Sequence, residues 1–195
     1  MGFLMTASRQ CWRQFSEGWN MQLICSDTNV WIDFAAIDKI ELPFRLPYTY
    51  LMNTDAVNDE FLSPPGLGEK LVSFGLVPAE MTLKEFDCAE EYGWKYTRLS
   101  VYDRVALAMA KCRGIPLLTG DKALRRAAGE EGVEVIGTLF ILDKLAELGL
   151  LRDTELEECL RGLQALNGGA VRLPEFEITS RLVRLLRHRG RRTGE

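Results

Sequence analysis

Two short apolar runs, each followed by an aspartate, constrain the fold of this chain more than any other feature. Residues 22–26 (QLICS) precede Asp27, and residues 115–119 (IPLLT) precede Gly120 and Asp121. Short apolar runs that end in turn-forming residues are typical of buried strands in a parallel sheet. Segments with helical spacing separate the predicted strands, and this alternation predicts a doubly wound α/β sandwich. We therefore expect a three-layer α/β/α fold with a central, mostly parallel sheet, plus C-terminal helices.

The other elements are expected from periodicity and from capping residues. Ser100 is expected to cap a long helix that Gly114 ends, Thr54 to cap a shorter helix, and Thr154 to form a capping box with Glu157. Further strands are expected at 47–53, within 71–81, and at 133–136. Helices are expected over 30–40, 54–62, 83–96, 100–113, 122–131, 139–148, 154–166 and 178–188.

The length of 195 residues suits one well-cored domain plus a helical appendage. We expect the domain over 21–148 and the appendage over 149–195. Residues 1–20 are expected to be a loosely ordered extension, with Met21 as the natural start.

The net charge of −4 hides an asymmetry between the body and the end of the chain. Residues 181–192 carry six arginines and no acid, and without them and Glu195 the chain has 18 basic and 27 acidic residues, a net charge of −9. A basic tail of this kind contacts nucleic acid or an acidic partner, or is the solvated end of a last helix. Both interpretations stay open.

The cysteine and histidine content excludes several classes of enzyme. The five cysteines form no C-x-x-C pair, which argues against a zinc site, and their scattered placement fits a reducing compartment such as the cytoplasm. His188 is the single histidine and lies in the arginine-rich tail, so a Ser-His-Asp or Cys-His nucleophile system is not expected. We find no segment long and apolar enough to span a bilayer.

Four acids stand where a parallel sheet would gather them. Asp27 and Asp121 follow predicted strands, Glu60 lies on a short predicted helix, and Asp103 opens the long helix after Ser100. In open α/β sheets, ligands bind beyond the carboxyl ends of the strands. Clustered carboxylates repel one another unless a cation lies among them, and an all-oxygen cluster suits Mg²⁺ or Mn²⁺.

Each of these acids also has a purely structural interpretation. Asp27 is typical of an Asx turn, Asp103 of a capping box with Ser100, and Asp121 of an N-cap. For Glu60 the alternative is an exposed helical residue, with Asp55 or Asp59 as the member of the cluster in its place. The acids Asp33 and Asp38 are expected to be solvated. Four aromatic side chains are expected either in the core or stacked on bases: Trp31, Phe34, Trp94 and Tyr96.

The order of these motifs resembles the PIN-domain nucleases, and most closely the VapC-type toxin ribonucleases and related PIN proteins. The resemblance covers about 22–145 and rests on residues 26–32 (SDTNVWI), 100–108 (SVYDRVALA), 118–121 (LTGD) and 124–128 (LRRAA). The region around Glu60 matches least well.

The resemblance implies a Mg²⁺- or Mn²⁺-dependent ribonuclease with Asp27, Glu60, Asp103 and Asp121 as catalytic metal ligands. Ser26, Asn29 and Thr119 are the polar residues expected around the pocket, and Arg104, Arg125 and Arg126 are possible RNA contacts. It further implies a homodimer, and an antitoxin protein if the chain is the toxin of a type II pair. The alternative is a PIN-fold binding or regulatory protein with a weak or empty metal site. A structure-specific DNA nuclease would need a basic arch, and no insertion of that composition precedes residue 181.

Overall fold

The computed structural model describes residues 22–61 and 65–192. The predicted extension over 1–20 lies outside the described residues, so that prediction is untested. Five strands form one sheet in the order β3-β2-β1-β4-β5, with every pair parallel. The strands are β1 (Gln22–Ser26), β2 (Tyr48–Asn53), β3 (Val77–Ala79), β4 (Leu117–Leu118) and β5 (Val135–Ile136).

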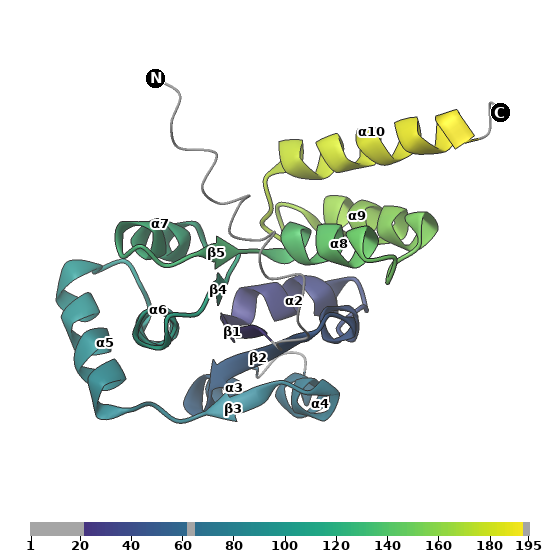
Figure 1. Cartoon of the computed structure of the whole chain (residues 1–195). Coiled ribbons are helices and arrows are strands. Elements are labelled where there is room, and N and C mark those ends of the chain that lie inside the picture. Colours follow the sequence, from purple (N-terminus) through teal and green to yellow (C-terminus); the bar gives the residue numbers. More distant parts are fainter. Residues whose placement is uncertain (1–21, 62–64, 193–195) are drawn as a thin grey trace, which may run out of the picture.

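Helices join the strands and extend beyond them (Figure 1). They are α2 (Thr28–Ala36), the 3-10 helix η1 (Leu42–Arg45), α3 (Thr54–Glu60), α4 (Leu67–Phe74), α5 (Leu83–Lys95), α6 (Val101–Arg113), α7 (Lys122–Glu130), α8 (Thr138–Glu147), α9 (Asp153–Leu166) and α10 (Glu175–Arg192).

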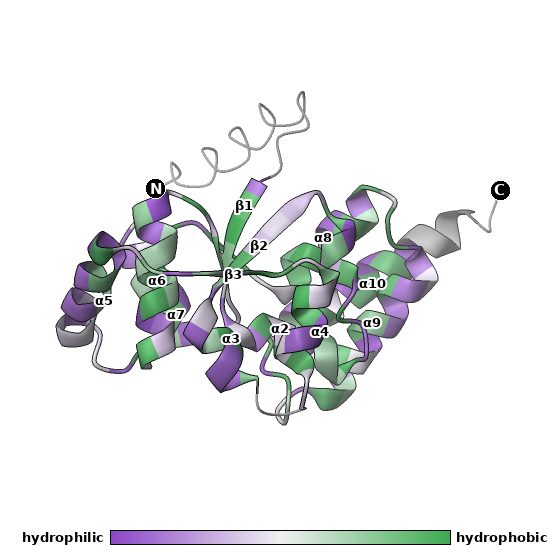
Figure 2. Cartoon of the chain, turned by 90° about the horizontal axis from the view of Figure 1, so that it is seen from below, coloured by the Kyte–Doolittle hydropathy of each residue, from purple (hydrophilic) through white to green (hydrophobic). Residues whose placement is uncertain are grey.

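The sheet separates two apolar clusters, because successive residues of a strand point to opposite faces. Ile24 of β1 belongs to the cluster that α2, α8, α9 and α10 cover, whereas Cys25 belongs to the cluster of α5, α6 and α7. Figure 2 shows these two groups of helices on opposite sides of the strands. The predicted three-layer α/β/α fold is confirmed, and the sheet is parallel throughout the described residues.

The aromatic side chains divide between core and surface. Trp31 and Phe34 are fully buried, and Trp31 stacks on Phe44 with ring centroids 5.2 Å apart. The core interpretation is therefore correct for these two residues. Trp94 is 87% exposed, so it remains available for stacking.

The prediction of a strand within 71–81 is wrong for its first half. Leu67 and Leu71 are buried one turn apart on α4, which Gly75 ends with a φ of 118°. Only Val77–Ala79 forms a strand, and it lies at the edge of the sheet. Pro78 explains this position, because proline lacks the N–H that an interior strand must donate.

Two predicted caps are displaced by one or two residues. Asn53, rather than Thr54, caps α3 by accepting a hydrogen bond from Ala56 N. The helix α9 begins at Asp153, and Glu155 accepts from the backbone N–H of Arg152, so the predicted Thr154–Glu157 box does not form.

The C-terminal helices bury apolar residues in the same cluster as α2. Leu160 and Leu163 of α9, and Ile178 and Leu182 of α10, belong to it. Arg181 also ties α10 to α8 through Asp143, with 2.7 Å between Nη2 and Oδ2. A domain boundary at 148/149 stays a prediction. Among the described helices, none has the length and apolarity that a bilayer crossing requires.

Candidate active site

Asp27 stands at the carboxyl end of the central strand β1 and caps α2. Its side chain is 5% exposed and accepts three hydrogen bonds. Oδ1 accepts from Thr28 N at 2.7 Å, and Oδ2 accepts from Asn29 Nδ2 and from Thr119 Oγ1, both at 2.8 Å. Asn29 and Thr119, the polar residues predicted to flank the pocket, therefore both donate hydrogen bonds to Asp27.

Burial raises the pKa of Asp27 to about 6. The hydrogen bonds from Thr119 and Asn29 act in the opposite direction, and the nearby charge of Asp103 raises the pKa further. Asp27 thus keeps its proton to a higher pH than an exposed aspartate does, and perturbed pKa values are common at functional sites.

Glu60 ends α3, the helix that follows β2, and β2 lies beside β1 in the sheet. Its carboxylate accepts a hydrogen bond from Thr28 Oγ1, so adjacent residues of α2 hold two of the acids. Partial burial raises the pKa of Glu60, and the charges of Asp103 and Asp59 raise it further. Thr28 was not among the predicted site residues, because only the fold brings it to Glu60.

Asp103 forms the capping box that the sequence allowed. Its N–H donates to Ser100 Oγ at 3.0 Å, and its Oδ2 accepts from Ser100 N at 2.8 Å. Its charge nevertheless lies close enough to raise the pKa of both Asp27 and Glu60. The capping role and the place near the other acids therefore coexist.

Asp121 caps α7 and is linked to Asp27 through one threonine. Its Oδ1 accepts from Leu124 N at 2.8 Å, and its backbone N–H donates to Thr119 Oγ1 at 3.1 Å. The same hydroxyl donates to Asp27, so Thr119 joins the acids at the ends of β1 and β4.

Ser26 lies beside Asp27 but supports the core instead of a carboxylate. Its hydroxyl donates to Leu51 O and accepts from Trp31 Nε1, both at 3.1 Å. Ser26 was expected among the polar residues around the pocket, but its hydroxyl instead links β1 to β2 and to α2.

A fifth acid, Asp33, lies near the same sheet edge, and the expectation that it is solvated is wrong. Its side chain is buried and accepts from Thr138 Oγ1 at 2.5 Å, and burial raises its pKa to about 6. A side chain at Gly120 would approach Asp33 and Asn29 to about 4 Å. Asp33 follows Asn29 by four residues, so both side chains lie on one face of α2. This spacing is the sequence feature from which the position of Asp33 could have been predicted.

The three predicted RNA-contact arginines have different surroundings. Arg104 packs against Gly93, where an added Cβ would lie 2.3 Å from Nη1, and its Nε donates to Ser100 O. Arg126 is exposed and pairs with Glu130 at 3.1 Å. Among the described residues, Arg125 donates only to the backbone carbonyls of Thr119 and Ile136.

The donor chemistry of the site fits a hard cation, but its side chains do not enclose one. None of the four predicted ligands forms an ion pair with a described residue. Within 22–61 and 65–192, no group of three or more His, Cys, Asp or Glu side chains is arranged to hold a metal ion. Mg²⁺ commonly binds through one or two carboxylates and several waters, so Asp27 with water-mediated neighbours remains a compatible arrangement.

The raised pKa of Asp27 predicts a pH dependence of stability. Between its ordinary value of 3.8 and about 6, folded Asp27 binds a proton that the unfolded chain does not, so its contribution to the free energy of unfolding falls as pH rises. As the pH rises from 4 to 6, we expect the free energy of unfolding of Asp27→Asn to increase relative to that of the wild type, by up to about 3 kcal/mol. Above pH 6 the difference between the two proteins should stay constant. Urea unfolding of both proteins in EDTA measures the difference, and parallel pH profiles would contradict the shift.

Comparison with known proteins adds one finding. A family model described as a PIN domain matches residues 23–185. This range includes the four predicted acids, the two residues Asn29 and Thr119 that donate to Asp27, and most of α10. No curated protein and no solved structure gave a significant match.

Proposed function

The chain belongs to the PIN-domain family, a family of generally nucleolytic proteins, and we propose that it is a ribonuclease that hydrolyses RNA phosphodiester bonds with Mg²⁺ or Mn²⁺. The observation that carries the proposal is the position of Asp27. It is a buried carboxylate at the end of the central strand, and the charge of Asp103 repels it. The hydroxyl of Thr119 donates a hydrogen bond to Asp27 and accepts one from the backbone N–H of Asp121.

In this proposal, Asp27 and Asp121 hold one ion, and Asp103 and Glu60 complete the site directly or through water. A bound divalent ion supplies an acidified water and stabilises charge on the leaving oxygen. Asn29 and Thr119 orient the carboxylate of Asp27 by donating to its Oδ2. Burial raises the pKa of Glu60, so its carboxylate is a stronger proton acceptor than that of an exposed glutamate, and the proposed site offers no histidine for this task.

A toxin role within a type II toxin–antitoxin pair, with an antitoxin and a homodimer, is the finer part of this proposal. It rests on the resemblance of the sequence motifs to VapC-type proteins. A cytoplasmic location belongs to the same set of predictions.

The second candidate is a PIN-fold protein that binds RNA or a partner without cutting. One observation favours it: the carboxylates of Asp103 and Asp121 already accept hydrogen bonds as helix caps, so a cation must share or displace those bonds.

Incubation of the purified protein with a mixed RNA pool separates the two candidates. We expect discrete new RNA ends in Mn²⁺ and intact RNA in EDTA, with the ends mapped by sequencing. RNA that is retained by the protein in Mn²⁺ but stays uncut would support the second candidate.

A further inference from the structure

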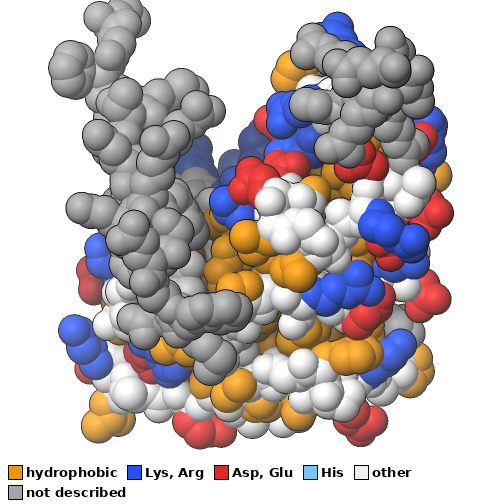
Figure 3. Space-filling model, turned by 45° about the vertical axis from the view of Figure 1, so that its right-hand side comes forward, with side chains coloured by type: hydrophobic (Ala, Val, Ile, Leu, Met, Phe, Trp, Pro, Cys, Tyr) orange, Lys and Arg blue, Asp and Glu red, His pale blue; other side chains and the backbone are white. Residues whose placement is uncertain are grey.

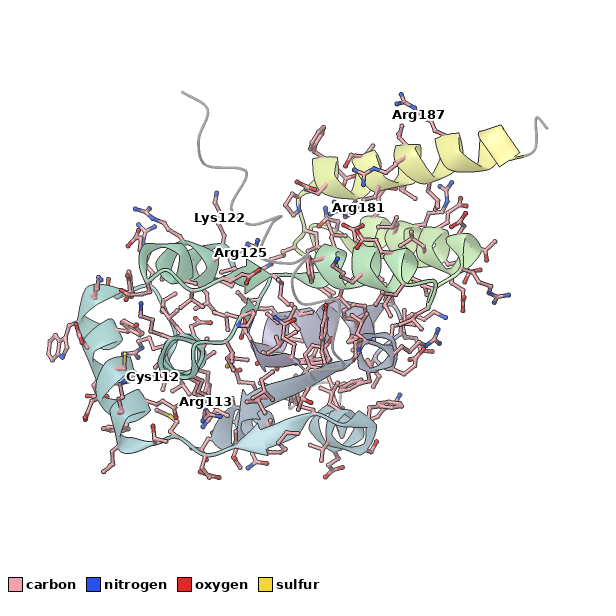
Figure 4. All side chains as sticks on the ribbon, viewed as in Figure 1. Cys112, Arg113, Lys122, Arg125, Arg181 and Arg187 are labelled. Carbon is pink, nitrogen blue, oxygen red and sulfur yellow. The ribbon has the colours of Figure 1, made fainter. Side chains whose placement is uncertain are left out.

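A cleft of about 930 Å³ opens beside the acids, between the sheet and the C-terminal segment. One side comprises α7 and the carboxyl ends of β4 and β5, and the other comprises residues 167–174 and the start of α10. Figure 4 shows Arg125 on the α7 side and Arg181 on α10. The C-terminal segment therefore forms one wall of a hollow that begins at the sheet edge.

Four cationic side chains line this cleft, and only one of them is neutralised by acids. Arg181 pairs with Asp143 at 2.7 Å and with Glu177 at 2.6 Å. In the part of the chain that the structure describes, the other three form no ion pair: Lys122, Arg125 and Arg172. Three positive charges without acidic partners favour an anionic ligand.

Arg125 is held in position by the ends of two strands. Its Nη1 donates to Thr119 O at 2.9 Å and to Ile136 O at 3.4 Å. Gly137 leaves room for this contact, because an added Cβ would lie 3.1 Å from Nη1. Nε and Nη2 have no hydrogen-bond partner among the described residues, so an oriented guanidinium edge remains for a phosphate oxygen.

Apolar side chains line the same cleft, including Phe140, Leu173 and Pro174. Cationic donors beside apolar and aromatic surface match a nucleotide, whose phosphate needs charge and whose base needs a flat apolar contact. Simple inorganic anions would not use the apolar part.

The cleft also meets the acidic site. Thr119 lines it, and the hydroxyl of Thr119 donates to Asp27. A second cleft of about 820 Å³ lies on the α5 side of Asp121. There Lys95 pairs with Glu131 and Arg126 pairs with Glu130, and the two other cations are Arg98 and Lys122, the latter shared with the first cleft. On the face that Figure 3 draws, acidic, basic and apolar side chains are interspersed.

We propose that the cleft binds one nucleotide of a single-stranded RNA substrate next to the bond to be cut. Arg125 and Arg172 hold its phosphate, and Phe140 and Leu173 contact its base. This inference rests on the proposed function, and it gives the C-terminal segment a role in binding the substrate.

The test uses two adjacent arginines of α7 that line different clefts, and Arg126 is no longer among the expected RNA contacts because it is exposed and paired with Glu130. Arg125→Gln and Arg126→Gln remove the same charge from the same helix, and RNA affinity is measured in EDTA with a fluorescent single-stranded oligonucleotide. We expect Arg125→Gln to weaken binding roughly tenfold and to reduce the salt dependence by about one phosphate contact, whereas Arg126→Gln changes affinity less than about twofold. Arg172→Gln, which removes no hydrogen bond or ion pair within the described residues, should weaken binding without lowering the melting temperature.

The outcomes separate this inference from the ribonuclease proposal. Weaker binding by the Arg125 and Arg172 variants, with no cleavage by the wild type in Mn²⁺, would keep the cleft assignment and reject the nuclease. Unchanged binding by both variants, a larger loss with Arg126→Gln, or no RNA binding by the wild type would overturn the cleft assignment.

Discussion

Asp27→Asn is expected to abolish Mn²⁺-dependent RNA cleavage while the protein stays folded. Asp27 is the most buried of the four acids, and its charge is the one that a cation at the end of β1 would neutralise. Metal-ion catalysis contributes several kcal/mol, so the loss should be on the order of a thousandfold or more. Single-turnover cleavage of a labelled RNA in Mn²⁺ measures the rate.

The fold should survive because asparagine has nearly the same shape as aspartate and its Oδ1 still accepts a hydrogen bond from Thr28 N, although its amide nitrogen cannot accept the bonds that Asn29 and Thr119 donate to Asp27. The matched control is Asp87→Asn, which removes an equal charge from an exposed position of α5. Circular dichroism should show the same helix content in all three proteins. Cleavage by Asp27→Asn at the wild-type rate would defeat the assignment of the site.

Trp31→Ala should cause the largest loss of stability. Trp31 is fully buried on α2, its ring stacks on Phe44 and meets Tyr50 edge-on at 5.1 Å, and its Nε1 donates to Ser26. Truncation of a buried tryptophan costs about 3–5 kcal/mol, a large share of the 5–15 kcal/mol typical of a domain. Urea unfolding followed by circular dichroism measures the change.

Trp94→Ala provides the comparison, because Trp94 is 87% exposed on α5. Its removal should change the free energy of unfolding by less than about 0.5 kcal/mol. Equal losses for the two variants would mean that Trp31 is not in the core of the protein in solution.

The positions of the strands and of the acids at their ends were predictable from sequence. An apolar run such as 22–26 is a local pattern, and the parallel arrangement then brings Asp27 and Asp121 to one edge. The predicted strand region 71–81 forms a strand only over Val77–Ala79, because Leu67 and Leu71 follow a helical period that the flanking glycines obscured.

The partners of the site residues were less predictable, since they come from distant parts of the chain. Thr28 meets Glu60 across 32 positions, and Thr138 meets Asp33 across 105. Ser26 was expected beside the carboxylates, yet its side chain points to the core because successive residues of β1 face opposite sides. Residues 167–181 form one wall of the first cleft, and the position of this wall depends on how α10 packs relative to the sheet. No local sequence pattern predicts that packing.

Mn²⁺ titration of the melting temperature tests most directly whether these separated acids share one cation. A ligand that binds only the folded state stabilises it by about 2.7 kcal/mol at a concentration 100 times its dissociation constant. We predict that saturating Mn²⁺ raises the melting temperature of the wild type by several degrees and leaves that of Asp27→Asn unchanged. An equal response of both proteins, or no response of the wild type, would contradict a metal site at the end of β1.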